Sequence, residues 1–369
     1  MQKDHFFIVL ISITFFLCTL GCNFFKKQQV KSDRDISSRW PIQKAQKWGK
    51  NTPWLVGANF IPSTAINQLE TWQAETFDPE TIDRELGLAE TIGFNCMRVY
   101  LHHLAWQIDR KGFKSRIEKY LSIADKHGIK TIFVFFDDCW NEEYHEGKQP
   151  IPKPGIHNSG WVRDPGNRIF QDPTLIDTLE VYVKDILNTF SNDNRIVLWD
   201  LYNEPGNNGL LNKSMNLLEK VFRWAREISP SQPVSSAVWN LGNLDLTDLN
   251  IFQLENSDII TYHNYEDSSH HFTLLEKLKK YNRPIICTEY MARTRGSRFD
   301  NILPTLKKEK VGAICWGFVA GKTNTIYAWD TPMPDGSEPK IWFHDLFRKN
   351  GTPYDSSEIE LIKKFTGKL

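Results

Sequence analysis

Residues 196–205 read Ile-Val-Leu-Trp-Asp-Leu-Tyr-Asn-Glu-Pro, an apolar run that ends in an amide, a carboxylate and a proline. A short run of this kind is typical of a buried strand in a parallel sheet, and proline ends it because proline has no backbone N–H for the ladder. This run predicts a strand over Ile196–Asn203, and seven similar runs occupy Trp54–Phe60, Asn95–Leu101, Lys130–Asp137, Pro233–Trp239, Asp258–Tyr265, Pro284–Tyr290 and Val311–Val319. The sequence therefore predicts eight strands.

Amphipathic segments separate these strands and predict helices. They are Ile82–Ile92, Ile117–His127, Leu175–Phe190, Met215–Ile228 and Leu274–Tyr281. Strands that alternate with helices indicate βα units and a parallel sheet. An open doubly wound sheet usually carries a glycine-rich loop after its first strand, whereas this chain has Asn59-Phe60-Ile61-Pro62 there. We therefore expect an α/β fold, a (β/α)8 TIM barrel that forms a single catalytic domain over residues 51–369.

The N-terminal residues have the features of an export signal. Lys3 precedes an apolar run of 15 residues, Phe6–Leu20. This run is short for a membrane-spanning helix, which needs about 20 residues, but it suits a secretory signal peptide. It ends in Leu20-Gly21-Cys22, which resembles the lipobox of bacterial lipoproteins. We expect a signal peptide over residues 1–22, lipidation of Cys22, a tether and lead-in over 23–50, and export to a bacterial membrane surface. An uncleaved signal anchor is the alternative.

The composition limits the possible partners. The chain has 45 basic and 45 acidic residues without a long run of one sign, which argues against nucleic acid, whose binding needs a basic face. Aromatic residues make up 13% of the chain and include 13 tryptophans, whose flat rings suit the apolar faces of sugars. We expect the protein to be a monomer with a carbohydrate partner. We expect it to contact the membrane only through its lipid anchor.

Cysteine and histidine patterns point away from a metal or other cofactor and from disulfides. Cys96, Cys287 and Cys315 lie in predicted strands, where cysteine behaves as a small apolar residue, and Cys139 lies in a loop. The sequence has no His-Glu-x-x-His or paired Cys-x-x-Cys motif. The adjacent pair His102-His103 would direct its two rings to opposite sides of an extended backbone.

Two glutamates end predicted strands. Glu204 ends the fourth run, and Glu289 ends the seventh in Cys287-Thr288-Glu289-Tyr290. The carboxyl ends of barrel strands form the active-site face of this fold, and these two strands lie on opposite sides of it. Retaining glycosidases need two carboxyl groups about 5–5.5 Å apart. We expect Glu204 and Glu289 to form such a pair; the alternative is a structural role in salt bridges.

This pattern resembles the clan A glycoside hydrolases, (β/α)8 barrels that include the family 5 cellulases and mannanases. In that clan an Asn-Glu pair that carries the acid/base ends strand four and a nucleophilic Glu ends strand seven, as Asn203-Glu204 and Glu289 do here. The resemblance therefore implies that Glu204 is the acid/base and Glu289 the nucleophile. The resemblance covers about residues 50–350. It also extends to a group of cellulase-like or β-xylanase-like lipoproteins.

The resemblance implies further site residues. Arg98 would keep the nucleophile ionised, and Tyr265, in the strand-six pair with His263, would donate a hydrogen bond to it. Asn203 would bind a sugar hydroxyl, and Trp316 would form the floor of a sugar subsite.

One position departs from the family pattern. Many family 5 enzymes have a histidine at the end of strand three, where this chain has Asp137. Two interpretations remain open, namely that Asp137 accepts hydrogen bonds from sugar hydroxyls or that it caps the following loop. We expect that loop, Asp138–Thr174, to wall the cleft and Asn59 to line it. Four tryptophans are candidates for stacking on sugars or for packing: Trp140, Trp161, Trp239 and Trp329.

These observations predict a retaining β-glycoside hydrolase that works by double displacement. Its substrate would be a β-linked oligo- or polysaccharide such as xylan, mannan, glucan or galactan. The sequence leaves open the sugar, the linkage and the choice between exo and endo action. The alternatives are a non-catalytic carbohydrate-binding lipoprotein on the same barrel and a transglycosylase that uses the same residues.

Overall fold

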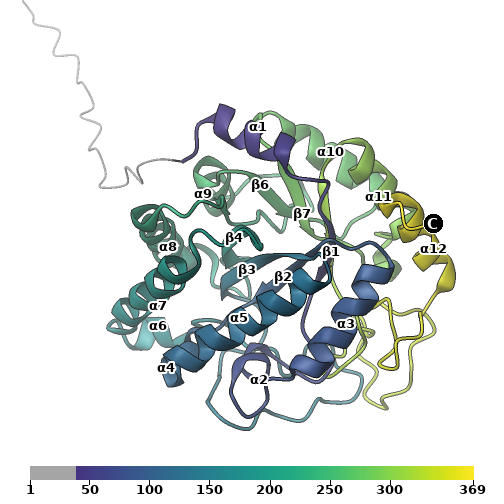
Figure 1. Ribbon diagram of the computed structural model, residues 1–369, viewed down its shortest axis with the longest axis horizontal. Coiled ribbons are helices and arrows are strands. Elements are labelled where there is room, and N and C mark those ends of the chain that lie inside the picture. The colour runs from purple at the N-terminus through teal and green to yellow at the C-terminus, as the bar shows by residue number, and fades with distance from the viewer. Residues whose placement is uncertain (1–38) are drawn as a thin grey trace, which may run out of the picture. The chain divides into compact units, whose positions relative to one another are not determined.

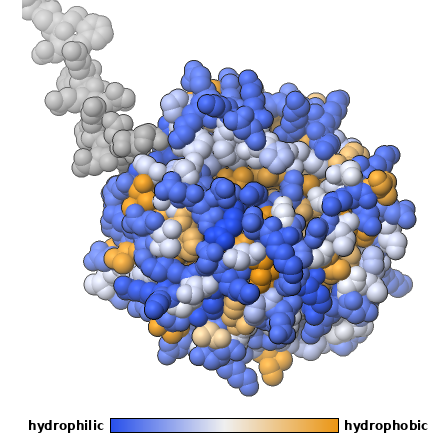
Figure 2. All heavy atoms as spheres, viewed as in Figure 1, coloured by the Kyte–Doolittle hydropathy of each residue, from blue (hydrophilic) through white to orange (hydrophobic). Residues whose placement is uncertain are grey.

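The computed structural model describes residues 39–369 (Figure 1). The predicted signal peptide, Cys22 and the tether up to residue 38 lie outside the described residues. Among residues 39–369, no helix is both long enough and apolar enough to cross a membrane. On the face shown in Figure 2 the surface is mainly hydrophilic, and its apolar residues form small separate patches.

Eight parallel strands form the centre of the fold, as predicted. They are β1 Val56–Asn59, β2 Cys96–Tyr100, β3 Lys130–Asp137, β4 Ile196–Asn203, β5 Val234–Ser235, β6 Ile260–His263, β7 Ile285–Glu289 and β8 Gly312–Cys315. They pair in the order β5-β4-β3-β2-β1-β8-β7-β6. Three backbone hydrogen bonds join β5 and β6 together with the residues next to them (Asp258 N to Val234 O, 2.9 Å; Val238 N to Thr261 O, 3.0 Å; His263 N to Val238 O, 2.9 Å). The sheet is therefore a barrel.

Helices surround the strands (Figure 1). They are α1 Ile42–Asn51, α2 Gln68–Trp72, α3 Pro79–Thr91, α4 His103–Ile108, α5 Arg110–Lys126, α6 Arg168–Gln171, α7 Leu175–Phe190, α8 Met215–Ile228, α9 Asp248–Asn256, α10 Ser268–Lys279, α11 Phe299–Lys308 and α12 Ser356–Thr366, with 3-10 turns η1 Leu211–Ser214 and η2 Arg293–Arg295. Helix α5 shows why they pack. Asp109 caps its N-terminus by accepting from Gly112 N, and its apolar residues at helical spacing, such as Phe113, Ile117 and Leu121, are buried.

Alternate residues of each strand point into the barrel or out toward the helices. Outward residues such as Met97 and Val99 join the main core with the helices. A second apolar cluster, which we call the barrel floor, combines Ala45 with inward residues at or just before the N-terminal ends of the strands: Leu55, Cys96, Ile132, Leu198, Ile259, Ile286 and Ile314. Ala45 belongs to α1, with Trp48 packed beside it. The last part of the expected lead-in is therefore a helix that covers this end of the barrel.

Strand β5 is shorter than its apolar run suggests. The run Pro233–Trp239 gives only two residues of regular ladder. Its serine hydroxyls take over part of the bonding, since Ser235 donates to Ile259 O at 3.0 Å and Ser236 donates to Tyr202 O at 2.7 Å. The chain can therefore leave the ladder early without losing contact with its neighbours.

Candidate active site

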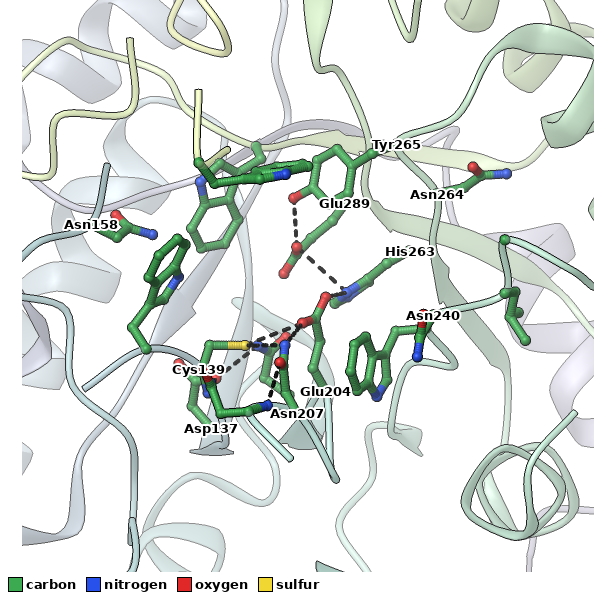
Figure 3. Close-up of a pocket in the computed structure, with 18 of the residues that line it drawn as sticks. Asp137, Cys139, Asn158, Glu204, Asn207, Asn240, His263, Asn264, Tyr265 and Glu289 are labelled. Atoms are coloured by element: carbon green, nitrogen blue, oxygen red, sulfur yellow. Dashed lines mark hydrogen bonds and ion pairs between the residues drawn. The ribbon is translucent and has the colours of Figure 1, made fainter. Parts of the chain in front are cut away.

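A cavity of about 520 Å³ opens at the C-terminal ends of the strands, and we call it the cleft (Figure 3). Both glutamates, Glu204 and Glu289, line it. The tryptophans Trp140, Trp161, Trp239, Trp316 and Trp329 also line it, so all four stacking candidates and the strand-eight tryptophan meet at one site. Residues from the loop Asp138–Thr174 form part of the wall, as expected.

Glu204 is directed into the cleft by a strained turn. It follows β4 directly and has a φ of 44°, a left-handed conformation that residues other than glycine rarely adopt. The turn is held in place because Gly206 N donates to Asp138 Oδ2 at 2.7 Å. Burial in turn raises the pKa of the Asp138 carboxyl to about 6. The sequence Asn-Glu-Pro-Gly thus ends the strand and fixes the direction of the carboxylate.

Three groups bind the carboxylate of Glu204. His263 Nδ1 lies 2.8 Å from Oε1, while Cys139 Sγ at 3.2 Å and Asn207 Nδ2 at 2.5 Å contact Oε2. Burial raises the pKa of the Glu204 carboxyl, and the hydrogen bonds from Cys139 and Asn207 only partly oppose this effect. A raised pKa favours the protonated form of a carboxyl, which is the form that a general acid uses.

Glu289, at the end of β7, has a different environment. Its Oε1 accepts from Arg98 Nη1 at 2.7 Å and from the Tyr100 hydroxyl at 2.9 Å. Its Oε2 accepts from the Tyr265 hydroxyl at 2.6 Å. An ionised carboxylate only accepts hydrogen bonds, so these donors match it. The contacts expected of Arg98 and Tyr265 are both present.

Arg98 is fully buried and connects several strands. Besides Glu289 it pairs with Asp200 of β4 at 2.8 Å, and it donates to Asn203 Oδ1 at 2.7 Å and to Asn59 Oδ1 at 2.8 Å. The Asn59 amide nitrogen in turn donates to Thr288 O at 2.8 Å. Asn59 therefore holds Arg98 and does not line the cleft, contrary to expectation. The reason is that both ends of its amide are bonded inside the barrel.

The two glutamates face each other across His263. One carboxylate oxygen of Glu204 and one of Glu289 lie within 4.8 Å of each other. His263 Nδ1 lies 3.5 Å from Glu289 Oε2 in addition to its contact with Glu204. Burial lowers the pKa of His263 to about 4, so the ring is neutral near pH 7. This spacing is that of a retaining glycosidase, where the second carboxylate must reach the sugar directly.

Comparison with known proteins agrees with this geometry. Residues 57–322 match the family described as cellulase (glycosyl hydrolase family 5). The chain belongs to glycosyl hydrolase family 5. It is therefore a glycoside hydrolase of the retaining clan A type, as the resemblance implied. Among curated proteins, no sequence matches the chain.

Solved structures with the same fold share little sequence with this family 5 enzyme. An endo-β-1,4-mannanase from Thermotoga petrophila has a TM-score of 0.52 and 15% identity, and the match covers 86% of this chain and 77% of that one. An exo-β-1,4-mannosidase from Opitutaceae bacterium strain TAV5 has a TM-score of 0.57 and 16% identity, over 85% and 59% of the two chains. A family 5 mannosidase from Rhizomucor miehei has a TM-score of 0.52 and 13% identity, and the match covers 86% of this chain and 94% of that one.

Asp137 of this family 5 enzyme is occupied by protein groups. Its Oδ1 accepts from Asn203 Nδ2 at 2.9 Å and from Cys139 N at 2.9 Å, and its Oδ2 accepts from Trp161 Nε1 at 2.7 Å. Burial raises the pKa of Asp137 to about 7. These contacts favour the interpretation that Asp137 caps the following loop, because both of its oxygens already have donors.

A second buried cluster fastens the same loop. His102 and His103 both lie beside Asp164, with their rings stacked 5.2 Å apart. The expectation that the rings point apart was wrong, because His102 caps α4 and His103 begins it, so the backbone is not extended there. The residue types could bind a metal, but protein groups bind the ring nitrogens, as with His102 Nε2 at 3.1 Å from Arg163 O and His103 Nδ1 beside Asp164 Oδ1.

Several residues that contact the glutamates or Arg98 were not predicted from the sequence. Tyr100 follows Arg98 by two residues and so shares its face of β2, a signal that strand periodicity offers. Asp200 could have been found by the same rule, because it lies inside the strand that carries Glu204. Cys139 and Asn207 lie in loops, and nothing in their local sequence indicates that they contact Glu204.

Proposed function

We propose that this enzyme hydrolyses a β-linked oligo- or polysaccharide by double displacement, with Glu204 as acid/base and Glu289 as nucleophile. The observation that carries the proposal is that two carboxylates lie within 4.8 Å in contrasting surroundings. Glu289 accepts hydrogen bonds from Arg98 and two tyrosines, whereas burial raises the pKa of Glu204. One carboxyl is thus suited to attack and the other to donate a proton.

The steps follow from these positions. Glu289 attacks the anomeric carbon while Glu204 donates its proton to the leaving oxygen, which gives a glycosyl ester on Glu289. Glu204, now ionised, then takes a proton from water, which hydrolyses the ester and restores both carboxyls. Tyr265 and Arg98 hold Glu289 in position for attack through the contacts described above.

The cleft supports a sugar ligand. Trp316 packs edge to face against Tyr100 and Trp161, with ring centres 6.0 and 5.7 Å apart, and we propose that it forms the floor of a sugar subsite. Trp140 lies on the loop after β3, and we propose that it stacks on a neighbouring sugar. The amide nitrogen Nδ2 of Asn203 lies 3.4 Å from Cys139 Sγ, a weak acceptor that a sugar hydroxyl would replace when substrate binds.

Variants of the two glutamates test the proposal. Aryl β-mannosides, glucosides, xylosides and galactosides are screened first, with the mannosides leading because the similar structures described above are β-mannanases and mannosidases. Glu289→Ala should lower kcat/KM by about 10⁴-fold or more on every substrate. Glu204→Ala should lose about 10²- to 10⁴-fold on poor leaving groups and keep activity on good ones, with azide restoring turnover.

Glu142→Ala, on the same loop as Trp140 but outside the cleft lining, serves as a matched control and should retain full activity. Proton NMR of the first product identifies its anomer. An inverted anomer would contradict the double displacement. Binding without turnover would support the carbohydrate-binding alternative, and a new glycosidic bond at high sugar concentration would support the transglycosylase.

We also propose that the enzyme is exported and anchored through a lipid on Cys22. The support is the apolar run followed by Leu20-Gly21-Cys22. Metabolic labelling with a fatty acid should mark the wild-type protein and leave Cys22→Ser unlabelled. Equal labelling of both proteins would contradict the anchor.

A further inference from the structure

Cys139 lies in the wall of the cleft beside Glu204 (Figure 3). Its sulfur is 3.2 Å from Glu204 Oε2, 3.3 Å from Asn207 Nδ2 and 3.4 Å from Asn203 Nδ2. The other cysteines of the described residues lie in strands and do not line the cleft: Cys96, Cys287 and Cys315. Among the cysteines of residues 39–369, Cys139 is therefore the one whose thiol contacts the acid/base.

The direction of the hydrogen bonds follows from the chemistry of the groups. An ionised carboxylate has no proton to give, so the thiol donates its S–H to Glu204. The two asparagine amides donate their N–H groups to the sulfur. Each bond polarises the next in the same sense, and this strengthens the bond that reaches Glu204.

The backbone holds the thiol in this place. Cys139 N donates to Asp137 Oδ1 at 2.9 Å, and Asp137 is fixed in turn by the Trp161 indole at 2.7 Å. Burial and the nearby carboxylates of Asp137 and Glu204 raise the pKa of the Cys139 thiol well above its ordinary value. The thiol thus remains a donor throughout the pH range in which a glycosidase works.

We propose that Cys139 is a positioning residue for the acid/base: its S–H holds Glu204 Oε2 in place and stabilises the carboxylate form of Glu204 against burial. This inference rests on the proposed role of Glu204. The other groups that face Glu204 are His263 of β6, Arg98 of β2, Glu289 of β7 and Asn207 of the turn after β4. Substitution of Cys139 leaves all of these in place.

The sign of the effect is fixed by the reaction. A general acid works in its protonated form, so kcat/KM falls as the pH rises through the pKa of Glu204. Loss of the S–H donor destabilises the carboxylate and raises that pKa. The basic limb of the pH profile should therefore move to higher pH in Cys139→Ala, by about 0.5–1 pH unit.

Three variants test this in the pH profile of kcat/KM, measured on an aryl β-glycoside with a poor leaving group, because its hydrolysis depends on proton donation by Glu204. Cys139→Ala removes the donor, and Cys139→Ser replaces it with a stronger one. Cys96→Ala, in the barrel floor, is the matched control for loss of a buried thiol. In Cys139→Ala we expect the basic limb to move to higher pH. In Cys139→Ser it should stay at the wild-type pH or move to lower pH, and in Cys96→Ala it should not move.

Two measurements do not depend on turnover. Titration of ¹³C-labelled glutamate by NMR, with Glu204 assigned by its loss in Glu204→Ala, should show the same shift in Cys139→Ala. The infrared S–H stretching band of Cys139, assigned by its loss in Cys139→Ser, should move to higher wavenumber in Glu204→Ala, because the acceptor is gone. The infrared comparison needs neither activity nor a folded Cys139→Ala variant.

An unchanged pKa of Glu204 in Cys139→Ala would overturn the proposal. So would an S–H band of Cys139 that has the same wavenumber in Glu204→Ala as in the wild type. A basic limb that moves to higher pH in Cys139→Ser by as much as in Cys139→Ala would also overturn the proposal, because loss of the sulfur atom, and not loss of a donor, would then explain the shift. A protein that turns over no glycoside but shows both spectroscopic shifts would keep this hydrogen bond and overturn only the proposed function.

Discussion

The two ends of the barrel are formed by the same strands, but apolar side chains fill one end and charged side chains fill the other. At the floor, inward side chains such as Cys96 and Leu198 are apolar and buried with α1. Two residues further along the same strands, the inward side chains are Arg98 and Asp200, which pair at 2.8 Å. Two residues correspond to about 6.6 Å of strand, so an apolar layer lies directly beneath a charged network.

This difference separates stability from chemistry. Burial of apolar side chains at the floor and under the helices stabilises the barrel. The network at the cleft places one guanidinium between the carboxylates of Asp200 and Glu289, all three nearly or fully buried. Buried charges of this kind contribute little net stability, but removal of one partner is costly. Three substitutions at the two ends test this division.

Arg98→Met should have the largest effect. It leaves Asp200 and Glu289 as buried carboxylates without their cation, which should lower the free energy of unfolding by about 3–5 kcal/mol. It should also remove activity, because Glu289 loses its donor. Urea unfolding and kcat/KM measure the two effects. If Arg98→Met has the same free energy of unfolding as the wild type, the guanidinium of Arg98 is not what stabilises the buried carboxylates.

Leu198→Ala probes the floor. The cavity it leaves should lower the free energy of unfolding by about 2–5 kcal/mol. The value of kcat/KM per folded molecule should stay within about twofold of the wild-type value, because Leu198 does not line the cleft. A tenfold loss of kcat/KM in fully folded protein would show instead that the floor sets the geometry of the cleft.

Tyr265→Phe should have the smallest effect of the three on the free energy of unfolding. It removes the 2.6 Å hydrogen bond to Glu289 but keeps the ring contact with Trp329, whose centre lies 5.0 Å away. We expect kcat/KM to fall about tenfold and the free energy of unfolding to change by less than about 1 kcal/mol. Tyr354→Phe, which alters a hydroxyl outside the cleft, is the control and should leave kcat/KM unchanged.

The sequence predicted the barrel well where the local signal was sharp. Strands β3 and β4 begin and end at the predicted residues, because polar or proline residues end their apolar runs. β5 was predicted too long, since its serine hydroxyls replace ladder bonds with partners that are distant in sequence. The floor role of α1 also depends on contacts with strands far along the chain.

The site was predictable where it depends on strand ends. Glu204 and Glu289 were found because a strand end in a barrel faces the cleft. Asn59 also ends a strand, but its amide turns inward to Thr288 O and Arg98. Cys139 reaches Glu204 through a loop path that is fixed by contacts such as that of Asp137 with Trp161, and a linear sequence does not show such contacts.

The tryptophans of the cleft give the protein a built-in optical probe. Trp140, Trp239, Trp316 and Trp329 are each partly exposed in the cavity. A saccharide that covers their rings removes water from the indoles and so alters their fluorescence. Inactive Glu289→Ala protein could therefore be titrated with unlabelled oligosaccharides of increasing length, and the number of sugar units at which affinity stops rising would measure how much of a glycan chain the cleft accommodates.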